Sequence, residues 1–259
     1  MVIFVFLIGT VIGSFLNAFI YRLPKGISIL RGRSFCPNCK KTIFWYDNIP
    51  LLSFLLLGAR CRSCKKKISW QYPLIEFLTG LVFVLLFYLQ PQIISNLTWL
   101  GNLNPYVSLS YLFLLAFLLL AIFFIDLKHT IIPDETIFLG FTITFFILIL
   151  ANFDSFYSHL LAGFSAGLFL LLLHLLTFGR GMGLGDVKLA VFLGSVLGLY
   201  NSLIWLTTSF IIGGFIGLIL ITSKKKKLKS QVPFGPFLII GFLITILWGN
   251  IIKQYVFGF

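Results

Sequence analysis

The segment FFIDLKHTIIPDE, residues 123–135, places three carboxylates between two long apolar runs. The preceding run covers residues 109–125 and the following one residues 136–151. A membrane-spanning helix needs roughly 17 to 25 mostly apolar residues, so each run is a candidate span. A carboxylate at the edge of a hydrocarbon layer is costly and marks a candidate functional group. The segment therefore predicts two membrane helices joined by an acidic turn.

The whole chain has the composition of an integral membrane protein. Hydrophobic residues make up 59% of the 259 residues and charged residues only 10%, whereas about a quarter of a soluble domain is charged. We therefore expect an all-α polytopic membrane protein with about eight transmembrane helices. The first run lacks a basic leader and a small-residue cleavage site, so we expect it to be retained. The runs lie near residues 2–20, 72–90, 109–125, 136–151, 158–178, 187–200, 202–222 and 236–252.

The basic residues gather on one side of this eight-helix arrangement. The chain has 20 Lys and Arg against 7 Asp and Glu, a formal net charge of +13. Nearly all of the basic residues fall in four segments on that side, and we interpret the last of them as a charged loop at the lipid surface. The positive-inside rule makes these segments cytoplasmic and puts both termini outside. The net charge thus reflects the membrane, and we expect no nucleic-acid partner. The four segments are residues 22–71, 126–134, 179–188 and the KKKKLK run at 224–229.

The segment between the first two helices, residues 22–71, contains all four cysteines. Two C-x2-C pairs about twenty residues apart are typical of a zinc ribbon, in which four thiolates close a tetrahedral site. Disulfides are the alternative, but a cytoplasmic segment lies in a reducing compartment. We therefore predict a small zinc-ribbon-like insert with a structural zinc ion. Its ligands would be Cys36, Cys39, Cys61 and Cys64.

Three of the acids outside the opening segment are Asp47, Asp154 and Glu76, and their positions suggest different roles. Asp47 in the insert and Asp154 in an outer loop are expected to be solvated. Glu76 lies just inside the second helix, where it would reach the interface, pair with an arginine of the insert, or contribute to a second site.

The three acids of the opening segment also differ. Asp134 and Glu135 start a helix, where an N-cap or first-turn carboxylate is favourable. Asp126 ends a helix, where the helix dipole disfavours negative charge. Asp126 is therefore the acid whose position needs a functional reason.

A second acid, Asp186, lies in the glycine-rich segment GRGMGLGDVK, residues 179–188. A helix N-cap is the structural alternative for it. Asp126 and Asp186 are predicted at the same depth on the same face. Two carboxylates brought together there would share a proton, with one activating water and the other polarising a carbonyl, as in aspartic proteases. The three histidines are scattered, so the acid pair is the best candidate for catalysis.

The chain resembles a known family, the prepilin peptidases, which are bacterial membrane aspartic proteases of the GxGD type. The resemblance covers nearly the whole chain. It rests on GTVIGSFLNAFIYRLPKG at 9–26, the two C-x2-C pairs, YPLIEFLTG at 72–80, FIDLKHTIIPD at 124–134, GMGLGDVKL at 181–189 and PFGPFL at 233–238.

The resemblance implies a membrane endopeptidase with Asp126 and Asp186 as the catalytic pair. It would remove the basic leader of type IV prepilins or pseudopilins at the cytoplasmic face of the bacterial inner membrane. It would also N-methylate the new N-terminal residue, usually phenylalanine, with S-adenosylmethionine, for which Glu76 is a candidate residue. The resemblance further implies active-site support from Gly183, Gly185, Lys188, Pro233 and Gly235, although PFGPFL would also serve simply as a turn opening the last helix.

The expected organisation has four parts: a first helix (1–21), the zinc insert (22–71), a second helix with an outer loop (72–108) and a six-helix peptidase core (109–259). Two functional alternatives stay open. One is a peptidase without methyl transfer. The other is an ion- or proton-coupled transporter that uses the intramembrane acids.

Overall fold

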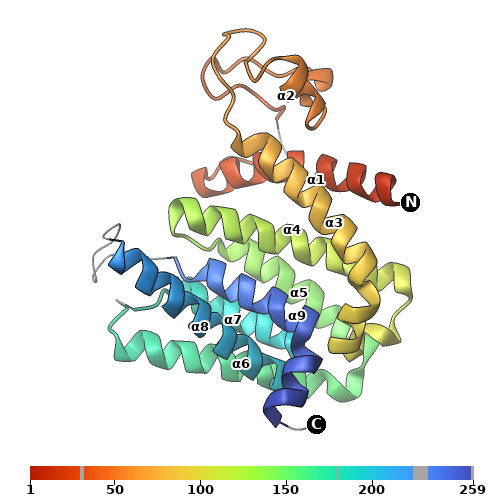
Figure 1. The fold of residues 1–259 in the computed structure, drawn as a ribbon, viewed down its shortest axis with the longest axis vertical. Coiled ribbons are helices and arrows are strands. Elements are labelled where there is room, and N and C mark those ends of the chain that lie inside the picture. The colour runs from red at the N-terminus through yellow and green to blue at the C-terminus, as the bar shows by residue number, and fades with distance from the viewer. Residues whose placement is uncertain (30–31, 180, 224–232, 258–259) are drawn as a thin grey trace. The chain divides into compact units, whose positions relative to one another are not determined.

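The structure is a computed structural model that describes residues 1–29, 32–179, 181–223 and 233–257 (Figure 1). The KKKKLK segment lies outside the described residues. Each of the eight expected apolar runs forms a helix, so the all-α fold class is confirmed. The helices are α1 (Val2–Arg22), α2 (Leu52–Leu56), α3 (Gln71–Asn96), α4 (Pro105–His129), α5 (Asp134–Ala151), α6 (Phe153–Leu176), α7 (Leu184–Leu197), α8 (Leu199–Thr222) and α9 (Gly235–Phe257).

Seven helices of the described chain are long and apolar enough to cross a membrane: α1, α3, α4, α5, α6, α8 and α9. The eighth, α7, has only 14 residues. At 1.5 Å per residue it is about 21 Å long, shorter than the ~30 Å of a hydrocarbon core. The protein is therefore a membrane protein with seven candidate spans and one shorter helix.

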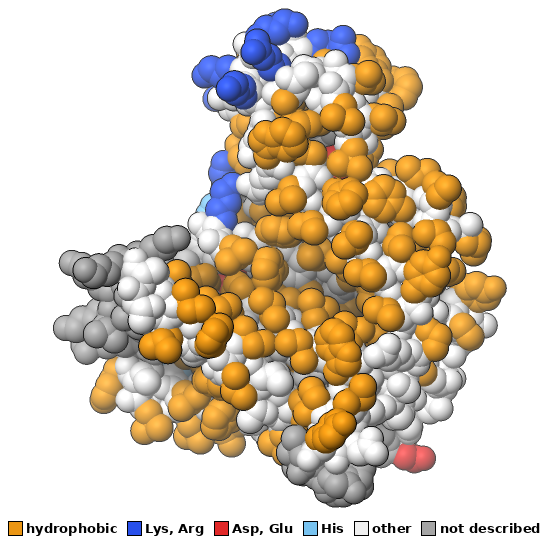
Figure 2. All heavy atoms as spheres, viewed as in Figure 1, with side chains coloured by type: hydrophobic (Ala, Val, Ile, Leu, Met, Phe, Trp, Pro, Cys, Tyr) orange, Lys and Arg blue, Asp and Glu red, His pale blue; other side chains and the backbone are white. Residues whose placement is uncertain are grey.

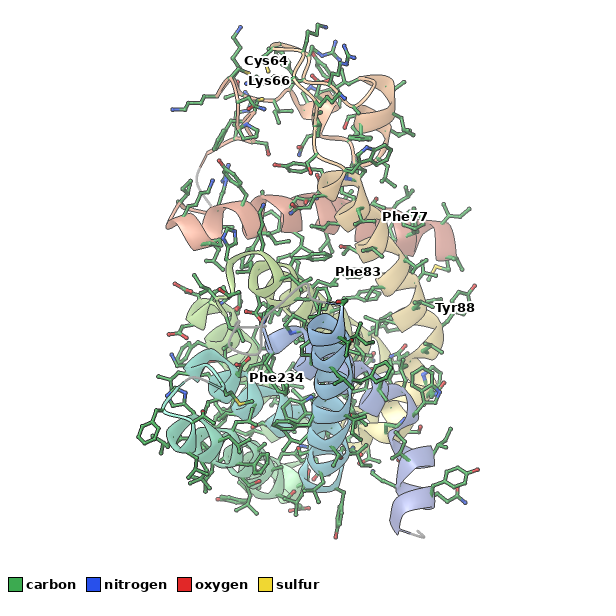
Figure 3. All side chains as sticks on the ribbon, turned by 60° about the vertical axis from the view of Figure 1, so that its left-hand side comes forward. Cys64, Lys66, Phe77, Phe83, Tyr88 and Phe234 are labelled. Carbon is green, nitrogen blue, oxygen red and sulfur yellow. The ribbon has the colours of Figure 1, made fainter. Side chains whose placement is uncertain are left out.

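The first of two compact units contains residues 1–88 and 112–121. Glycines let α1 and α3 approach closely: a Cβ on Gly9 would come within 2.7 Å of Gly80 Cα, as is common between membrane helices. Phe83 of α3 is fully buried and stacks on Phe113 at 4.2 Å between ring centroids (Figure 3). Phe77 and Tyr88 lie on another face of α3 and are exposed.

The second unit contains residues 89–111 and 122–259 and is centred on α7. Helix α7 contacts α5, α6, α8 and α9, and most of its residues are buried. It meets α6 through glycines, since a Cβ on Gly194 would come within 2.9 Å of Gly163 Cα. Four neighbouring helices thus hold α7 in place, and its first turn contains Asp186.

Candidate functional site

Asp126 and Asp186 both belong to the second unit and are both buried. Asp126 lies in the last turn of α4, as predicted, and is only 4% exposed. Asp186 lies in the first turn of α7 and is 7% exposed. The Asp126 carboxylate is close enough to interact electrostatically with Asp186. The structure therefore brings these two acids into one site.

The surroundings of Asp126 are unusually tight. Its Oδ2 atom is buried and has no hydrogen-bond partner among the described residues. Gly235 at the start of α9 lies against this oxygen, since a Cβ on Gly235 would come within 2.6 Å of it. Ile132 lies between Gly235 and Gly185, at 3.1 and 3.0 Å from the Cβ positions of these glycines. The start of α9, the segment before α5 and the start of α7 therefore meet at the acids.

The local structure around Asp186 differs from a simple N-cap. Helix α7 begins at Leu184 with Gly183 as its N-cap, so Asp186 is the third helical residue. Its Oδ2 accepts a hydrogen bond of 3.1 Å from the Gly183 backbone N–H. An acid at this position that reaches back to the N-cap amide is half of a capping box. The N-cap alternative for Asp186 is therefore wrong, and the first turn of α7 restrains its carboxylate.

Asp134 and Lys188 form an ion pair beside the buried acids. Asp134 is the first residue of α5 after the N-cap Pro133, which makes its predicted N-cap role wrong. Its two carboxylate oxygens accept bonds of 2.8 and 2.7 Å from Lys188 Nζ. The pair joins the first turns of α5 and α7. Glu135 lies in the first turn of α5, as predicted.

Pro233 is half-buried directly before α9, so PFGPFL does open this last helix.

The four cysteines of the insert are brought together as predicted. The Sγ atoms of Cys36, Cys39, Cys61 and Cys64 lie within 4.8 Å of one another, and all four are free thiols. Cys36 Sγ and Cys64 Sγ are 3.9 Å apart, close to the ~3.8 Å between thiolates at 2.3 Å from a tetrahedral zinc ion. This cluster could hold a metal ion.

The two cysteine pairs form matching turns. In the first turn Cys36 N–H donates to Lys41 O, and in the second Cys61 N–H donates to Lys66 O. The residue after each pair has a positive φ of 57°, Lys40 in the first turn and Lys65 in the second. The segments CPNCKK and CRSCKK therefore fold alike, and the repeated residues were the missed signal.

Three charged residues make specific contacts: Arg22 at the end of α1, and Asp47 and Arg62 in the insert. Arg62 holds Asp47 through two bonds of 2.7 and 2.8 Å, and this guanidinium lowers the pKa of Asp47, so Asp47 is not simply solvated. Arg22 is buried and donates to the carbonyls of Ser28, Gly32 and Arg33. Arg22 thus organises the start of the insert. The exposed basic side chains gather at the far end of the insert from α3 (Figure 2).

Asp154 does not lie in a loop, because it is in the first turn of α6.

Glu76 is buried and makes a contact that the sequence did not predict. Its Oε2 accepts a 2.9 Å hydrogen bond from the backbone N–H of Leu51, whose φ is +60°. Glu76 therefore joins α3 to the backbone of the insert and does not pair with an arginine in any described contact.

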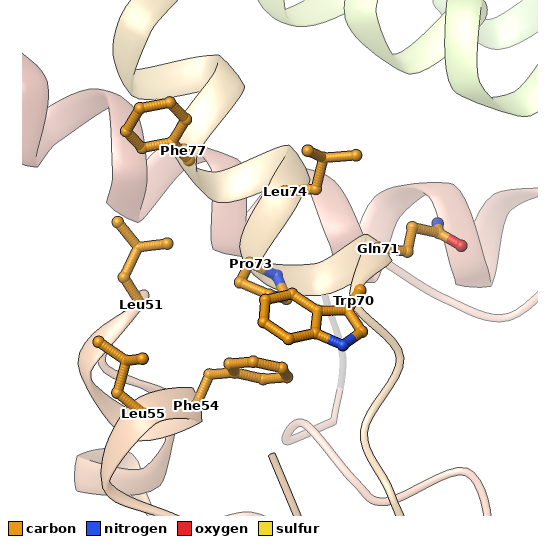
Figure 4. Close-up of a pocket in the computed structure, with 8 residues that line it drawn as sticks. All are labelled: Leu51, Phe54, Leu55, Trp70, Gln71, Pro73, Leu74 and Phe77. Carbon is orange, nitrogen blue, oxygen red and sulfur yellow. The ribbon is translucent and has the colours of Figure 1, made fainter. Parts of the chain in front are cut away.

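Leu51 also lines an apolar cavity of about 470 Å³ (Figure 4). Leu74 and Phe77 of α3 form one wall and continue an exposed apolar stripe on the same helix. Because α3 is long enough to span a membrane, this exposed stripe is suited to hydrocarbon. The other walls include Phe54, Leu55 and Trp70.

Comparisons with known proteins match both parts of the chain. Residues 7–90 match the bacterial peptidase A24 N-terminal domain, and residues 113–218 match the type IV leader peptidase family. No solved structure matches significantly.

Three relatives that match nearly the whole chain share the name prepilin leader peptidase/N-methyltransferase. The chain is 33% identical to the prepilin leader peptidase/N-methyltransferase of Aeromonas hydrophila, over 97% of this chain and 92% of the relative. It is 30% identical to that of Pseudomonas aeruginosa, over 96% and 90%. It is 28% identical to that of Bacillus subtilis, over 96% and 95%. These matches run through the cysteine insert and both acidic segments, and the chain therefore belongs to the type IV leader peptidase family.

Proposed function

We propose that this protein is a membrane aspartic endopeptidase that removes the leader of type IV prepilins or pseudopilins and then N-methylates the new N-terminal residue. The observation that carries the proposal is that the buried acids Asp126 and Asp186 lie on two sides of Ile132, near enough to interact electrostatically. The names of the relatives support both activities.

The proposed cleavage needs only the two carboxylates and a water molecule. Two adjacent carboxylates cannot easily both ionise, so the pair retains one proton. The ionised acid takes a proton from water, which attacks the scissile carbonyl carbon, while the protonated acid donates a hydrogen bond to the carbonyl oxygen. Proton transfer to the amide nitrogen then releases the new N-terminus, and the leader leaves with a carboxylate. Gly235 leaves space for the Asp126 carboxylate, and Gly183 donates its backbone N–H to Asp186.

We propose a structural zinc ion at the four cysteines, since the donor set and spacing fit it. The ion would hold the two matching turns together and give a small insert the stability that its few aliphatic residues cannot.

Replacing Cys61 by serine is expected to remove most of the bound zinc, because three thiolates and a hydroxyl close the tetrahedral site poorly. The zinc content of purified protein measures this, with Ser63→Ala as the control between the two ligands of the same turn. Equal zinc in Cys61→Ser and wild-type protein would contradict the metal assignment.

We assign methyl transfer, with S-adenosylmethionine as donor, to the insert and the start of α3. The proposed part of Glu76 is to hold Leu51, and with it the wall of the apolar cavity, in place. Proteolysis belongs to the core of residues 109–259.

We also propose that the protein lies in the bacterial inner membrane with the acid pair at the cytoplasmic face and both termini outside. The basic segments support this orientation through the positive-inside rule. It places the pair where a substrate with a basic leader and an apolar helix emerges from the bilayer.

The test is mass spectrometry of a prepilin incubated with purified protein and S-adenosylmethionine. We expect a cleaved product that carries one added methyl group at its N-terminus. A cleaved but unmethylated product would support the peptidase alternative, and an intact prepilin would contradict the proposal and favour the transporter alternative.

A further inference from the structure

His174 near the end of α6 lies against the glycine-rich loop that leads to Asp186. Its Nδ1 is 2.7 Å from the carbonyl oxygen of Met182. Since a carbonyl oxygen only accepts, Nδ1 must be protonated and must donate. The ring also covers Gly179, where a Cβ would come within 3.2 Å of His174 Cε1.

The next peptide atoms connect this contact to Asp186. The carbonyl of Met182 and the N–H of Gly183 belong to the same peptide group. The carbonyl accepts from His174, and the N–H donates to Asp186 Oδ2 at 3.1 Å. One planar peptide therefore links the imidazole to the carboxylate, and hydrogen bonds in such a chain strengthen one another.

Other contacts fold the loop around the end of α6. The N–H of Gly179 donates to His174 O at 2.8 Å, and the N–H of Gly181 donates to Thr177 Oγ1 at 3.2 Å. The Met182 side chain is buried. Gly179 has a φ of +72°, which suits glycine and brings the chain back over the ring. Among these contacts, only that of His174 Nδ1 is made by a side chain to the peptide that binds Asp186.

We propose that His174 is a positioning residue for Asp186, acting through the Met182–Gly183 peptide. This inference rests on the proposed function, in which Asp186 is one of the catalytic acids. Without the imidazole donor the peptide is free to tilt, and the Gly183 N–H no longer holds Asp186 Oδ2 in place. The step affected is catalysis at the acid pair, since His174 contacts only the chain's own loop.

The helix α6 supplies a matched control. His159 also lies on α6, and its Nδ1 lies 2.8 Å from the carbonyl oxygen of Ser195 in α7, whereas Met182 lies in the loop before α7. Ser195 is near the other end of α7, with no contact to the loop of residues 179–183 among the described bonds. Loss of the His159 donor therefore removes a similar imidazole–carbonyl bond of α6 without affecting the peptide that binds Asp186.

The experiment compares kcat and KM for prepilin cleavage by His174→Phe, His174→Asn, His159→Phe, Asp186→Asn and wild-type protein. Phenylalanine keeps a ring over Gly179 but has no donor, and the amide of asparagine replaces the Nδ1–H. We expect His174→Phe to lower kcat by roughly 10- to 100-fold with KM little changed, as for a misplaced catalytic group. His174→Asn should restore most of kcat, and His159→Phe should retain it.

Each other outcome has a definite meaning. A wild-type kcat in His174→Phe would overturn the inference. So would an equal loss in His174→Asn when its melting temperature matches that of the wild type. If His174→Phe does not fold, the high kcat expected of His174→Asn still decides. Cleavage by Asp186→Asn, or none by the wild type, would instead overturn the proposed function and this inference with it.

Discussion

Asparagine in place of Asp126 or Asp186 is expected to lower prepilin cleavage by roughly 10²- to 10⁴-fold, the range lost when a general acid or base is removed. The amide keeps the size of the carboxyl group but cannot take a proton from water. Each acid is buried and interacts with the other, so the remaining carboxyl group of a single variant would have to act alone. Because the two acids act as one unit, the double variant should be no worse than either single one. The measurement is the fraction of prepilin cleaved in cells that contain only the variant.

Two controls accompany this prediction. Membrane insertion is checked by the amount of each variant in the membrane fraction. Asp154→Asn, in the first turn of α6, should cleave at the wild-type rate, since Asp154 is exposed and outside the site. Full processing by Asp126→Asn or Asp186→Asn would refute the acid pair.

Replacing Gly235 by alanine, which adds one methyl group, is expected to lower cleavage by roughly 10²-fold, although Gly235 takes no part in the chemistry. The added Cβ would lie 2.6 Å from Asp126 Oδ2, well inside van der Waals contact. Ile132 on the other side, at 3.1 Å, leaves little room for the carboxylate to move away. A catalytic group displaced by about 1 Å loses activity on this scale. The measurement is kcat for Gly235→Ala at a temperature well below its melting temperature, since the added atom also costs about 1–3 kcal/mol of stability.

Gly214→Ala on α8 is the matched control, since a Cβ there meets nothing within 4 Å. It should keep the wild-type kcat, because alanine is favourable in a helix. Wild-type activity in Gly235→Ala would mean that Asp126 does not need its observed position.

The helices could be predicted from the sequence because apolar runs of this length have one stable arrangement in a bilayer. Their ends were within six residues of those observed. The run at 187–200 was counted as one of eight spans, whereas α7 is not among the seven candidate spans. Its central place among four helices depends on glycine contacts such as Gly163 to Gly194. Such long-range contacts leave no pattern in a single sequence.

The site was predictable in part. The cost of Asp126 at a helix end and the spacing of the cysteines are local signals, and the structure brings both groups together. The approach of Gly235 to Asp126 joins segments far apart in the chain, and only the resemblance to a family indicated it. His174 gave no signal, because one histidine in an apolar helix has no distinctive spacing. Asp134 was misread because its partner, Lys188, lies in another segment.

The measurement that tests the central claim most directly is the mass spectrum of a prepilin after incubation with purified wild-type, Asp126→Asn and Asp186→Asn protein of equal zinc content. We predict that the wild-type protein yields a leader with a new carboxylate and a shortened pilin, while both variants leave the precursor intact. Cleavage at the same bond by either variant would contradict the claim that Asp126 and Asp186 form the catalytic pair.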